Sequence, residues 1–522
     1  MRESRLTPHQ WIRVMVIVSI LSVVLSTTIT VILGLQDTTI QIYHTNDIHG
    51  YAVETLDDDG TPEHIGYARM KSYIDAQPVE HKLIVDAGDV LQGQSFATIT
   101  RGESMARLVQ GMSVDVMVPG NHDFDYGYTR LLELKEQYAL PIYAENIKKD
   151  GKNLFDGYVV KKFGRVKVGI LGITTPEVPV KTSPKNVEGL TFGNAQEILY
   201  SAAERVYALK KQKCSVIIAV MHMGDEAYLE PNSLQIAEFL PDIDIIIDGH
   251  SHTELENMKV NNTVIASTGE YMENLGVLTL HLKGKRLQSI DAQLIPAADF
   301  KDVEPDAKIS ALIDAINADI EPILQEVVME SPARLEGERD IIRTQSTNLG
   351  RIVAESMRLE TGAELAITNS GGIRATVEPG PVTKGELVSV LPYGNMVMMI
   401  EATGAEIVET LNNVMILGEG SFPQFTGMTV EATLETGKES NGTEYQYCKV
   451  KRVLVDGAEI DPNKTYTVAI NDFIFTGGDN YMSLVEGKTA KEFGSMDEVL
   501  IQYMAFPDAV EVAGENNFIL VA

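Results

Sequence analysis

Residues 39–50 read TIQIYHTNDIHG, a short apolar run that ends in a cluster of histidine, asparagine and aspartate. A run of this length and composition is typical of a buried β-strand. The segment after it carries Asp47 and His49, whose side chains bind metals and transfer protons. The stretch therefore predicts a strand whose carboxyl end opens onto a functional site.

The same arrangement occurs four more times along the chain. Apolar runs are followed by the segments 86–89, 119–125, 221–225 and 248–252. In open α/β sheets, sites form in the crevice beyond the carboxyl ends of the strands. Aspartate or asparagine at such a place often caps a helix or forms a turn, but a turn has no preference for histidine. Half of the chain's histidines lie in these five segments: His49, His122, His222, His250 and His252.

The pattern indicates a metal site whose ligands are imidazole, carboxylate and amide groups. These donors suit Zn, Mn, Fe or Co rather than a closed structural zinc site, which usually contains thiolates. Six or seven candidate ligands exceed what one tetrahedral ion takes. We therefore expect two divalent metal ions that share a carboxylate and lie about 3.5–4 Å apart.

The chain divides into four parts by pattern. Residues 38–300 alternate short apolar runs with helical segments, as expected of a layered α/β domain. Apolar residues recur at helical spacing between 305 and 327, so 301–329 is expected to be a linker helix that Pro322 kinks or ends. Residues 330–522 mix helix, strand and glycine turns and form a second domain, while 1–37 stand apart at the N-terminus.

The N-terminal part has the layout of an export segment. Residues 14–35 carry no charged side chain and follow Arg2, Arg5 and Arg13. A helix of this length spans about 33 Å, close to a bilayer core of about 30 Å. The positive charges predict a cytoplasmic N-terminus and an extracytoplasmic working part. The length of the run favours a membrane anchor, and a signal peptide cut after Ser26 is the alternative.

Composition narrows the possible partners. The chain has 522 residues and a net charge of −31, which disfavours binding to a nucleic-acid polymer. With two cysteines, Cys214 and Cys448, it has no disulfide framework. The sequence leaves the oligomeric state open.

The motifs together resemble those of calcineurin-like metallophosphoesterases. They are Asp47-x-His49, Gly88-Asp89, Gly120-Asn121-His122-Asp123, His222 and Gly249-His250-Ser251-His252. The second domain is similar to that of the 5′-nucleotidase family, which includes UDP-sugar hydrolases. The resemblance implies a four-layer α/β/β/α sandwich joined by a helix to an α+β substrate-binding domain.

The resemblance also implies the metal ligands. One ion would be held by Asp47, His49, Asp89 and His252, and Asp89 would bridge to a second ion held by Asn121, His222 and His250. Some relatives carry glutamine where His252 stands. Zn, Mn and Co are the candidate ions. His122 would stabilise or protonate the transition state, with Asp125 orienting its ring.

In the second domain, the resemblance implies a nucleoside clamp. Arg343, Asn369 and Arg374 would bind phosphate and nearby polar groups, Tyr393 and Phe473 would sandwich the base, and Asp479 would bind the ribose. Most relatives have phenylalanine where Tyr393 stands. Arg339 matches a residue that some relatives use for longer phosphate chains.

The implied activity is an extracytoplasmic, two-metal hydrolysis of 5′-nucleotides, with UDP-sugars or nucleoside di- and triphosphates as further substrates. Family members bring substrate to the metals by rotating one domain against the other. Two alternatives stay open. One is a 2′,3′-cyclic-nucleotide phosphodiesterase with 3′-nucleotidase activity, and the other is an inactive surface-anchored binding protein.

Overall fold

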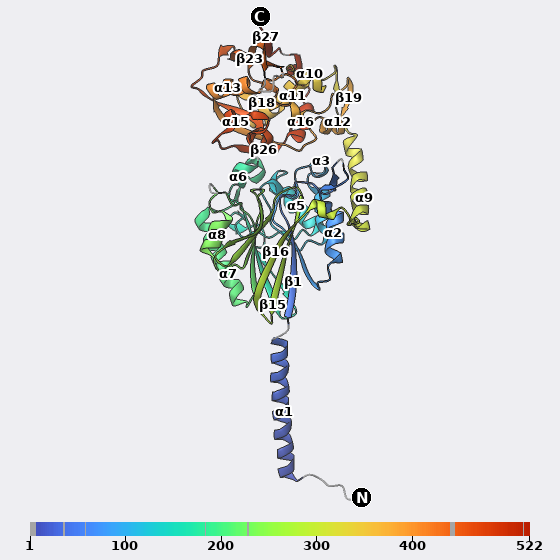
Figure 1. The fold of residues 1–522 in the computed structure, drawn as a ribbon, viewed down its shortest axis with the longest axis vertical. Helices are drawn as coiled ribbons and strands as arrows, with labels where there is room; N and C mark the ends of the chain where they lie inside the picture. The colour runs from blue at the N-terminus through green and yellow to red at the C-terminus, as the bar shows by residue number, and fades with distance from the viewer. Residues whose placement is uncertain are drawn as a thin grey trace.

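A computed structural model describes residues 7–34, 37–57, 59–182, 184–226, 229–438, 444–514 and 516–521. A single helix, α1 (Pro8–Gly34), precedes two domains that lie one above the other (Figure 1). The chain enters the lower domain at residue 37, and its C-terminal end lies at the far side of the upper domain.

The structure does not support the membrane span expected over residues 14–35. Within the part of the chain that was described, no helix combines the length and the apolar character needed to cross a membrane. The described residues do not include 35–36 or the side chains of 24–34. The expected cleavage point after Ser26 therefore lies outside the described residues. The structure therefore gives no support to a membrane-spanning helix that includes these residues.

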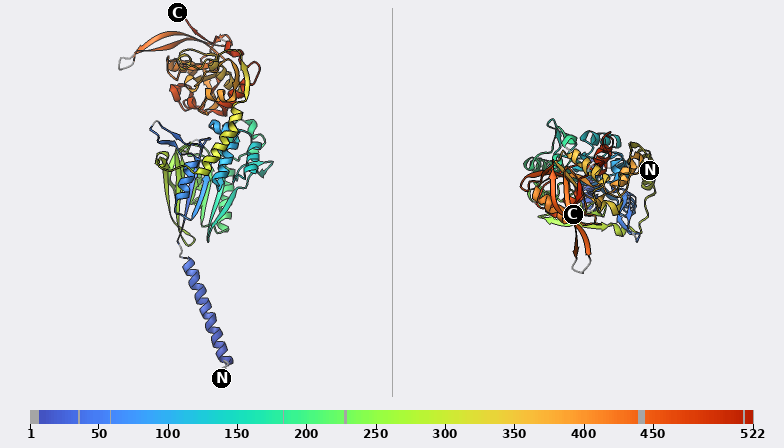
Figure 2. Two further views of the ribbon diagram at one scale, coloured as in Figure 1. Left: turned by 90° about the vertical axis from the view of Figure 1, so that its right-hand side faces the viewer. Right: turned by 90° about the horizontal axis from the view of Figure 1, so that it is seen from above.

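Two sheets pack face to face in the first domain (Figure 2). One has the order β16 (Arg286–Pro296), β15 (Asn274–Lys283), β1 (Asp37–Thr45), β4 (His81–Asp86) and β5 (Val116–Met117). The other has the order β13 (Glu254–Val260), β14 (Thr263–Thr268), β12 (Ile245–Ile247), β11 (Val216–His222), β9 (Val166–Thr174) and β8 (Tyr158–Phe163). β1, β4 and β5 are mutually parallel, as are β9, β11, β12 and β14.

Helices cover the outer face of each sheet. α2 (Gly66–Ala76), α4 (Glu103–Met112) and α5 (Tyr128–Tyr138) pack on the first, and α7 (Ala195–Lys211) and α8 (Ser233–Phe239) on the second. Ile42, Val85 and Ile218 are among the fully buried residues between the sheets. The predicted four-layer α/β/β/α sandwich is confirmed, and parallel strands bring their carboxyl ends to one edge.

α9 (Ala307–Leu324) leads from the first domain to the second. The Asp306 carboxylate caps its first turn by accepting hydrogen bonds from the N–H groups of Lys308 and Ile309. Its buried face belongs to the core of the first domain, together with residues of α2 and α4; this face consists of Ile309, Ile313, Ile316 and Ile320. Pro322 lies inside the helix, which ends two residues later.

The second domain has a central five-stranded sheet with helices on both faces. Its order is β21 (Pro423–Thr426), β18 (Leu365–Asn369), β25 (Thr465–Asn471), β20 (Met396–Thr403) and β26 (Lys491–Ser495). One face carries α11 (Asn348–Thr361), α12 (Lys384–Val390) and α16 (Met496–Met504), and the other carries α13 (Gly404–Val414) and α15 (Met482–Val485).

A further sheet has the order β24 (Ala458–Glu459), β23 (Glu444–Val455), β22 (Thr429–Lys438) and β27 (Phe518–Leu520), and its β22–β23 hairpin projects from the upper domain (Figure 2). Shorter elements are β2 (Thr55–Leu56), β3 (Pro62–His64), α3 (Ser95–Thr98), β6 (Lys148–Lys149), β7 (Lys152–Asn153), α6 (Val178–Lys181), β10 (Leu190–Thr191), β17 (Val327–Ser331), α10 (Arg339–Ile342), β19 (Gly380–Thr383) and α14 (Asp472–Phe475).

Candidate active site

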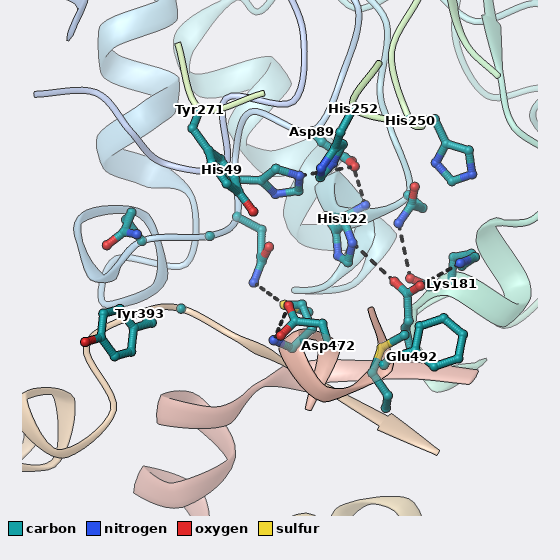
Figure 3. A pocket seen from close by; sticks show the side chains of 18 of the residues that line it. His49, Asp89, His122, Lys181, His250, His252, Tyr271, Tyr393, Asp472 and Glu492 are labelled. Carbon is teal, nitrogen blue, oxygen red and sulfur yellow. Dashed lines mark hydrogen bonds and ion pairs between the residues drawn. The ribbon is translucent and has the colours of Figure 1, made fainter. Parts of the chain in front are cut away.

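The five predicted strand ends meet at one place, on the side of the first domain that faces the second (Figure 3). Five of the predicted metal ligands adopt left-handed backbone conformations, which cost energy for residues other than glycine. Their φ angles lie between 45° and 86°, and the residues are Asp47, His49, Asp89, His250 and His252. Such strain persists only where the surrounding structure imposes it, and it gathers at functional sites.

A buried carboxylate holds two of these loops in place. Asp123 accepts hydrogen bonds from the N–H groups of Asp89 (3.0 Å), Leu91 (2.9 Å) and Gly120 (2.8 Å). Burial and the nearby Asp89 carboxylate raise the pKa of Asp123 to about 6. Asp123 thereby ties the loop after β4 to the loop after β5.

Asp47, His49 and His252 form one group of candidate metal ligands. One ligand atom from each lies within 4.8 Å of the others, and His252 Nε2 is 3.4 Å from Asp47 Oδ1. His49 Nε2 is buried and has no hydrogen-bond partner among the described residues. A buried nitrogen without a hydrogen-bond partner is energetically costly, so this atom is suited to bind a metal ion.

Asp47, Asp89 and His222 form a second group, within the same limit of 4.8 Å. His222 Nε2 lies 3.1 Å from Asp89 Oδ2 and 3.3 Å from Asn121 Oδ1. His222 Nδ1 donates to the Ala87 carbonyl at 2.8 Å, which leaves Nε2 as the ligand atom. Asp89 Oδ2 also lies 3.8 Å from His49 Nε2, so two carboxylates, Asp47 and Asp89, lie between the histidines.

The charges in this cluster are strongly coupled. Burial would raise the pKa of Asp47, but His252 and His222 outweigh burial and hold it at about 2. Burial would lower the pKa of His222, but Asp89 and Asp47 raise it to about 9. Burial lowers the pKa of His49 to about 4, so this imidazole is neutral and free to act as a ligand.

Two ligand histidines have carboxylate partners that sequence reasoning missed. His250 Nε2 lies 3.1 Å from Glu177 Oε2, and His252 Nδ1 forms an ion pair with Glu270. Carboxylates of this kind orient metal-binding imidazoles. Both follow the carboxyl ends of further parallel strands, Glu177 after β9 (ending at Thr174) and Glu270 after β14 (ending at Thr268), so the rule that located the other site residues could have found them.

His122 lies beside the two groups, as predicted, and Asp125 orients it. The distance from His122 Nδ1 to Asp125 Oδ2 is 2.8 Å, and the hydroxyl of Thr182 donates to the other oxygen of Asp125 at 2.5 Å. Burial would lower the pKa of His122, but the carboxylates of Asp125 and Asp89 raise it well above its usual value. The two carboxylates therefore favour the protonated, cationic form of the ring.

The predicted clamp residues cluster in the second domain. Asn369 Nδ2 donates to Asp479 Oδ2 at 2.7 Å, and the guanidinium of Arg374 lies 5.7 Å from the centre of the Tyr393 ring. Burial and the positive charges of Arg339 and Arg374 lower the pKa of Arg343, so three cations lie near one another. Tyr393 and Phe473 are 52% and 43% exposed, which leaves their rings open to stacking.

The clamp and the metal ligands are not joined in this structure. A pocket of about 200 Å³ between the domains is lined by His49, Asp89, Asn121, His122, His250 and His252 from the first domain. From the second domain it is lined by Tyr393, Asp472 and Glu492, among others. Within the described part of the chain, Arg339, Arg343, Asn369, Arg374, Phe473 and Asp479 are not among its lining residues.

Two family models match the chain. Residues 40–254 match the calcineurin-like phosphoesterases, and residues 327–486 match the C-terminal domain of 5′-nucleotidases. The chain belongs to the 5′-nucleotidase family. Its first domain makes it a phosphoesterase enzyme of a class that depends on divalent metals, in agreement with the ligand groups above.

Relatives in the 5′-nucleotidase family match over most of the chain. A 5′-nucleotidase of Vibrio cholerae is 26% identical, over 90% of this chain and 91% of its own length. The trifunctional nucleotide phosphoesterase YfkN of Bacillus subtilis is 28% identical over 89% of this chain, which spans only 33% of that longer protein. A solved 5′-nucleotidase precursor from Thermus thermophilus is 26% identical, with a TM-score of 0.54, 92% of this chain and 99% of that chain covered.

Proposed function

We propose that the protein is a nucleotide phosphohydrolase that uses two divalent metal ions to release phosphate from 5′-nucleotides. The observation that carries the proposal is the pair of ligand groups, Asp47–His49–His252 and Asp47–Asp89–His222, beside a cationic His122. Asn121 and His250 complete the ligand set, as family resemblance implies. Zn, Mn and Co are the ions that these donors suit.

Divalent ions bound here would supply a hydroxide at neutral pH and neutralise phosphate charge. The chain's own residues supply the rest. His122 Nε2 points into the pocket, where its proton can stabilise a phosphate oxygen or pass to the leaving oxygen. Asp125 keeps the ring in the orientation that this requires.

We propose that the clamp selects nucleotides. Arg343, Asn369 and Arg374 would bind phosphate and polar groups, Asp479 the ribose, and the exposed rings of Tyr393 and Phe473 the base. Stacking between two rings is tolerant of base identity and is worth roughly 1–3 kcal/mol per base. Several nucleobases should therefore be accepted.

Arg339 adds a charge that a longer phosphate chain could use, because it lies close enough to Arg343 to lower that residue's pKa. Turnover of AMP and of UDP-glucose, compared between wild type and Arg339→Ala, tests this role. The variant should lose UDP-glucose turnover selectively, and an unchanged ratio would exclude the role.

A cyclic-nucleotide activity is the second candidate. The chain is similar to YfkN, which is named a trifunctional nucleotide phosphoesterase, and a relative with more than one activity is the reason to test this candidate. Phosphate release from AMP, 3′-AMP and 2′,3′-cyclic AMP decides between the two. Release mainly from AMP supports the 5′-nucleotidase, release mainly from the other two supports the phosphodiesterase, and release from none of them leaves a binding protein.

We also propose that the two domains work outside the cytoplasm. Arg2, Arg5 and Arg13 before the uncharged run 14–35 are typical of an export segment, whether it is later removed or retained. Protease added to spheroplasts with an intact cytoplasmic membrane should digest the protein. Protection in these spheroplasts, with digestion after lysis, would contradict a location outside the cytoplasm.

A further inference from the structure

Glu492, in β26 of the second domain, reaches into the pocket of the first domain (Figure 3). Its Oε2 lies 3.3 Å from His122 Nε2, and its Oε1 lies 2.7 Å from Lys181 Nζ. Each oxygen of one buried carboxylate thus contacts a different cation of the opposite domain. Neither Glu492 nor Lys181 belongs to the motifs of the site.

Glu492 is held in its anionic form. Burial would raise its pKa, but the hydrogen bond from His122 and the charge of Lys181 bring the pKa down to about 2. The two cations therefore already bind an anion of this chain. Charge-assisted contacts of this length are among the stronger polar interactions in proteins.

The contact uses an atom that the reaction needs. His122 Nδ1 is occupied by Asp125, so Nε2 is the nitrogen available to a substrate. Since Glu492 Oε2 lies 3.3 Å from Nε2, a phosphate oxygen can take that place only after Glu492 has left. Departure of Glu492 also removes one carboxylate from Lys181 Nζ.

Lys181 is fixed beside the predicted metal ligands. It is the last residue of α6 and lines the same pocket as Asp89, and its carbonyl accepts a hydrogen bond from Asn121 Nδ2 at 3.3 Å. Its ammonium group is therefore positioned to meet any anion that replaces Glu492 at His122.

We propose that Lys181 is a phosphate-binding residue of the active site and that Glu492 occupies its place until a phosphate displaces it. The inference rests on the proposed function, because it assigns a further contact to the same phosphate. It adds to the clamp a cation from the first domain, and it makes the substrate compete with an internal carboxylate.

Binding of inorganic phosphate to the full, Mn-loaded chain, measured by titration calorimetry, tests the proposal without any turnover. Lys181→Gln should weaken binding about tenfold, the loss of one charge-assisted contact, and Lys181→Arg should retain most of the affinity. Glu492→Gln should strengthen binding about tenfold by removing the competing charge.

Glu360→Gln is the matched control. It breaks another ion pair between the domains, Lys185–Glu360 at 3.1 Å, whose lysine is exposed and lies outside the pocket. Phosphate affinity should not change in this variant. Unchanged binding in Lys181→Gln, weaker binding in Glu492→Gln, or no binding of phosphate to the wild type would each overturn the proposal.

The result of the phosphate-binding experiment can be distinguished from the result of the hydrolysis experiment that tests the proposed function. If phosphate binding follows these expectations while no nucleotide is hydrolysed, the anion site stands and the nucleotidase assignment fails. If AMP is hydrolysed but Lys181→Gln binds phosphate like the wild type, the nucleotidase stands and the role of Lys181 fails.

Discussion

At the scale of single residues, His122 is held through both its ring and its backbone. Asp125 fixes Nδ1, and the backbone N–H of His122 donates to Asp89 Oδ1 at 2.8 Å. The side chain of a predicted metal ligand and that of the proposed proton donor therefore cannot move independently. Because of this coupling, the surrounding site fixes the position of His122 as well as its charge.

We expect His122→Ala to lower kcat for AMP by roughly 100- to 10,000-fold, the usual contribution of a positioned acid. Asp125→Asn should have a smaller effect, because the ring keeps its place but loses the carboxylate that holds its charge. Metal content, measured by mass spectrometry, should stay at the wild-type level in both. A His122→Ala enzyme with wild-type kcat would contradict the assigned role.

Glu498 predicts a pH dependence of stability. Burial and Asp497 raise its pKa from 4.5 to about 7. The folded state therefore holds an extra proton between these values, so the free energy of unfolding falls as pH rises from about 4.5 to 7 and stays lower above pH 7.

Glu498→Gln removes this titration. Its stability relative to wild type, from urea unfolding, should be higher at pH 8 than at pH 5. Glu204 is exposed, so Glu204→Gln serves as the control. Its free energy of unfolding should differ from that of the wild type by the same amount at both pH values. If the free energy of unfolding of Glu498→Gln also differed from that of the wild type by the same amount at both pH values, the result would contradict the burial of a charged Glu498.

Much of the site was predictable at this scale because His and Asp follow apolar runs that form strands. Lys181 and Glu492 were not predictable, because each reaches the site from a segment without a pattern of its own. Glu177 and Glu270 were missed, although each follows the carboxyl end of an apolar strand. The backbone hydrogen bonds that make Asp123 a support for two loops likewise depend on the folded chain alone.

At the scale of elements, the layered α/β character of the first domain followed from short apolar runs, since strands buried on both faces are continuously hydrophobic. Its four-layer arrangement came from the family resemblance. α9 followed from its isoleucine spacing, which indeed forms its buried face. The expectation for Pro322 was right in that the helix ends just after it, at Leu324. The sequence did not indicate that α9 packs in the core of the first domain.

The packing of α9 in this core predicts how a shorter side chain at Ile316 changes stability. Ile316 is fully buried, so Ile316→Ala should lower the free energy of unfolding by about 2–5 kcal/mol, from lost burial and a remaining cavity. The exposed neighbour Asn317→Ala should be close to wild type. Equal midpoints of urea unfolding for the two variants would show that α9 does not contribute to the core.

At the scale of the whole molecule, the two halves of the proposed chemistry lie apart. Five of the seven predicted metal ligands line the pocket between the domains (His49, Asp89, Asn121, His250 and His252), whereas Tyr393 is the one predicted clamp residue among its described lining residues. Family resemblance implied a rotation between the domains, and we propose that such a rotation brings the clamp to the metal site. The contacts of Glu492 with His122 and Lys181 would break in the course of it.

Locking the domains tests the rotation. Cysteines at Lys185 and Glu360, joined by a cleavable thiol cross-linker in a Cys214→Ser background, should abolish AMP turnover and restore it after cleavage. Bound metal should stay constant throughout. Full turnover by the cross-linked protein would mean that rotation is not needed.

The central claim is that divalent metals at Asp47, Asp89 and the surrounding histidines drive phosphate release. The most direct measurement is phosphate release from AMP by the full chain, stripped of metal and then supplied with Mn, Zn, Co or Mg, beside Asp89→Ala. We predict no release from the stripped protein, recovery with at least one ion, and no recovery in Asp89→Ala. Release by the stripped protein, or equal recovery in the variant, would contradict the account.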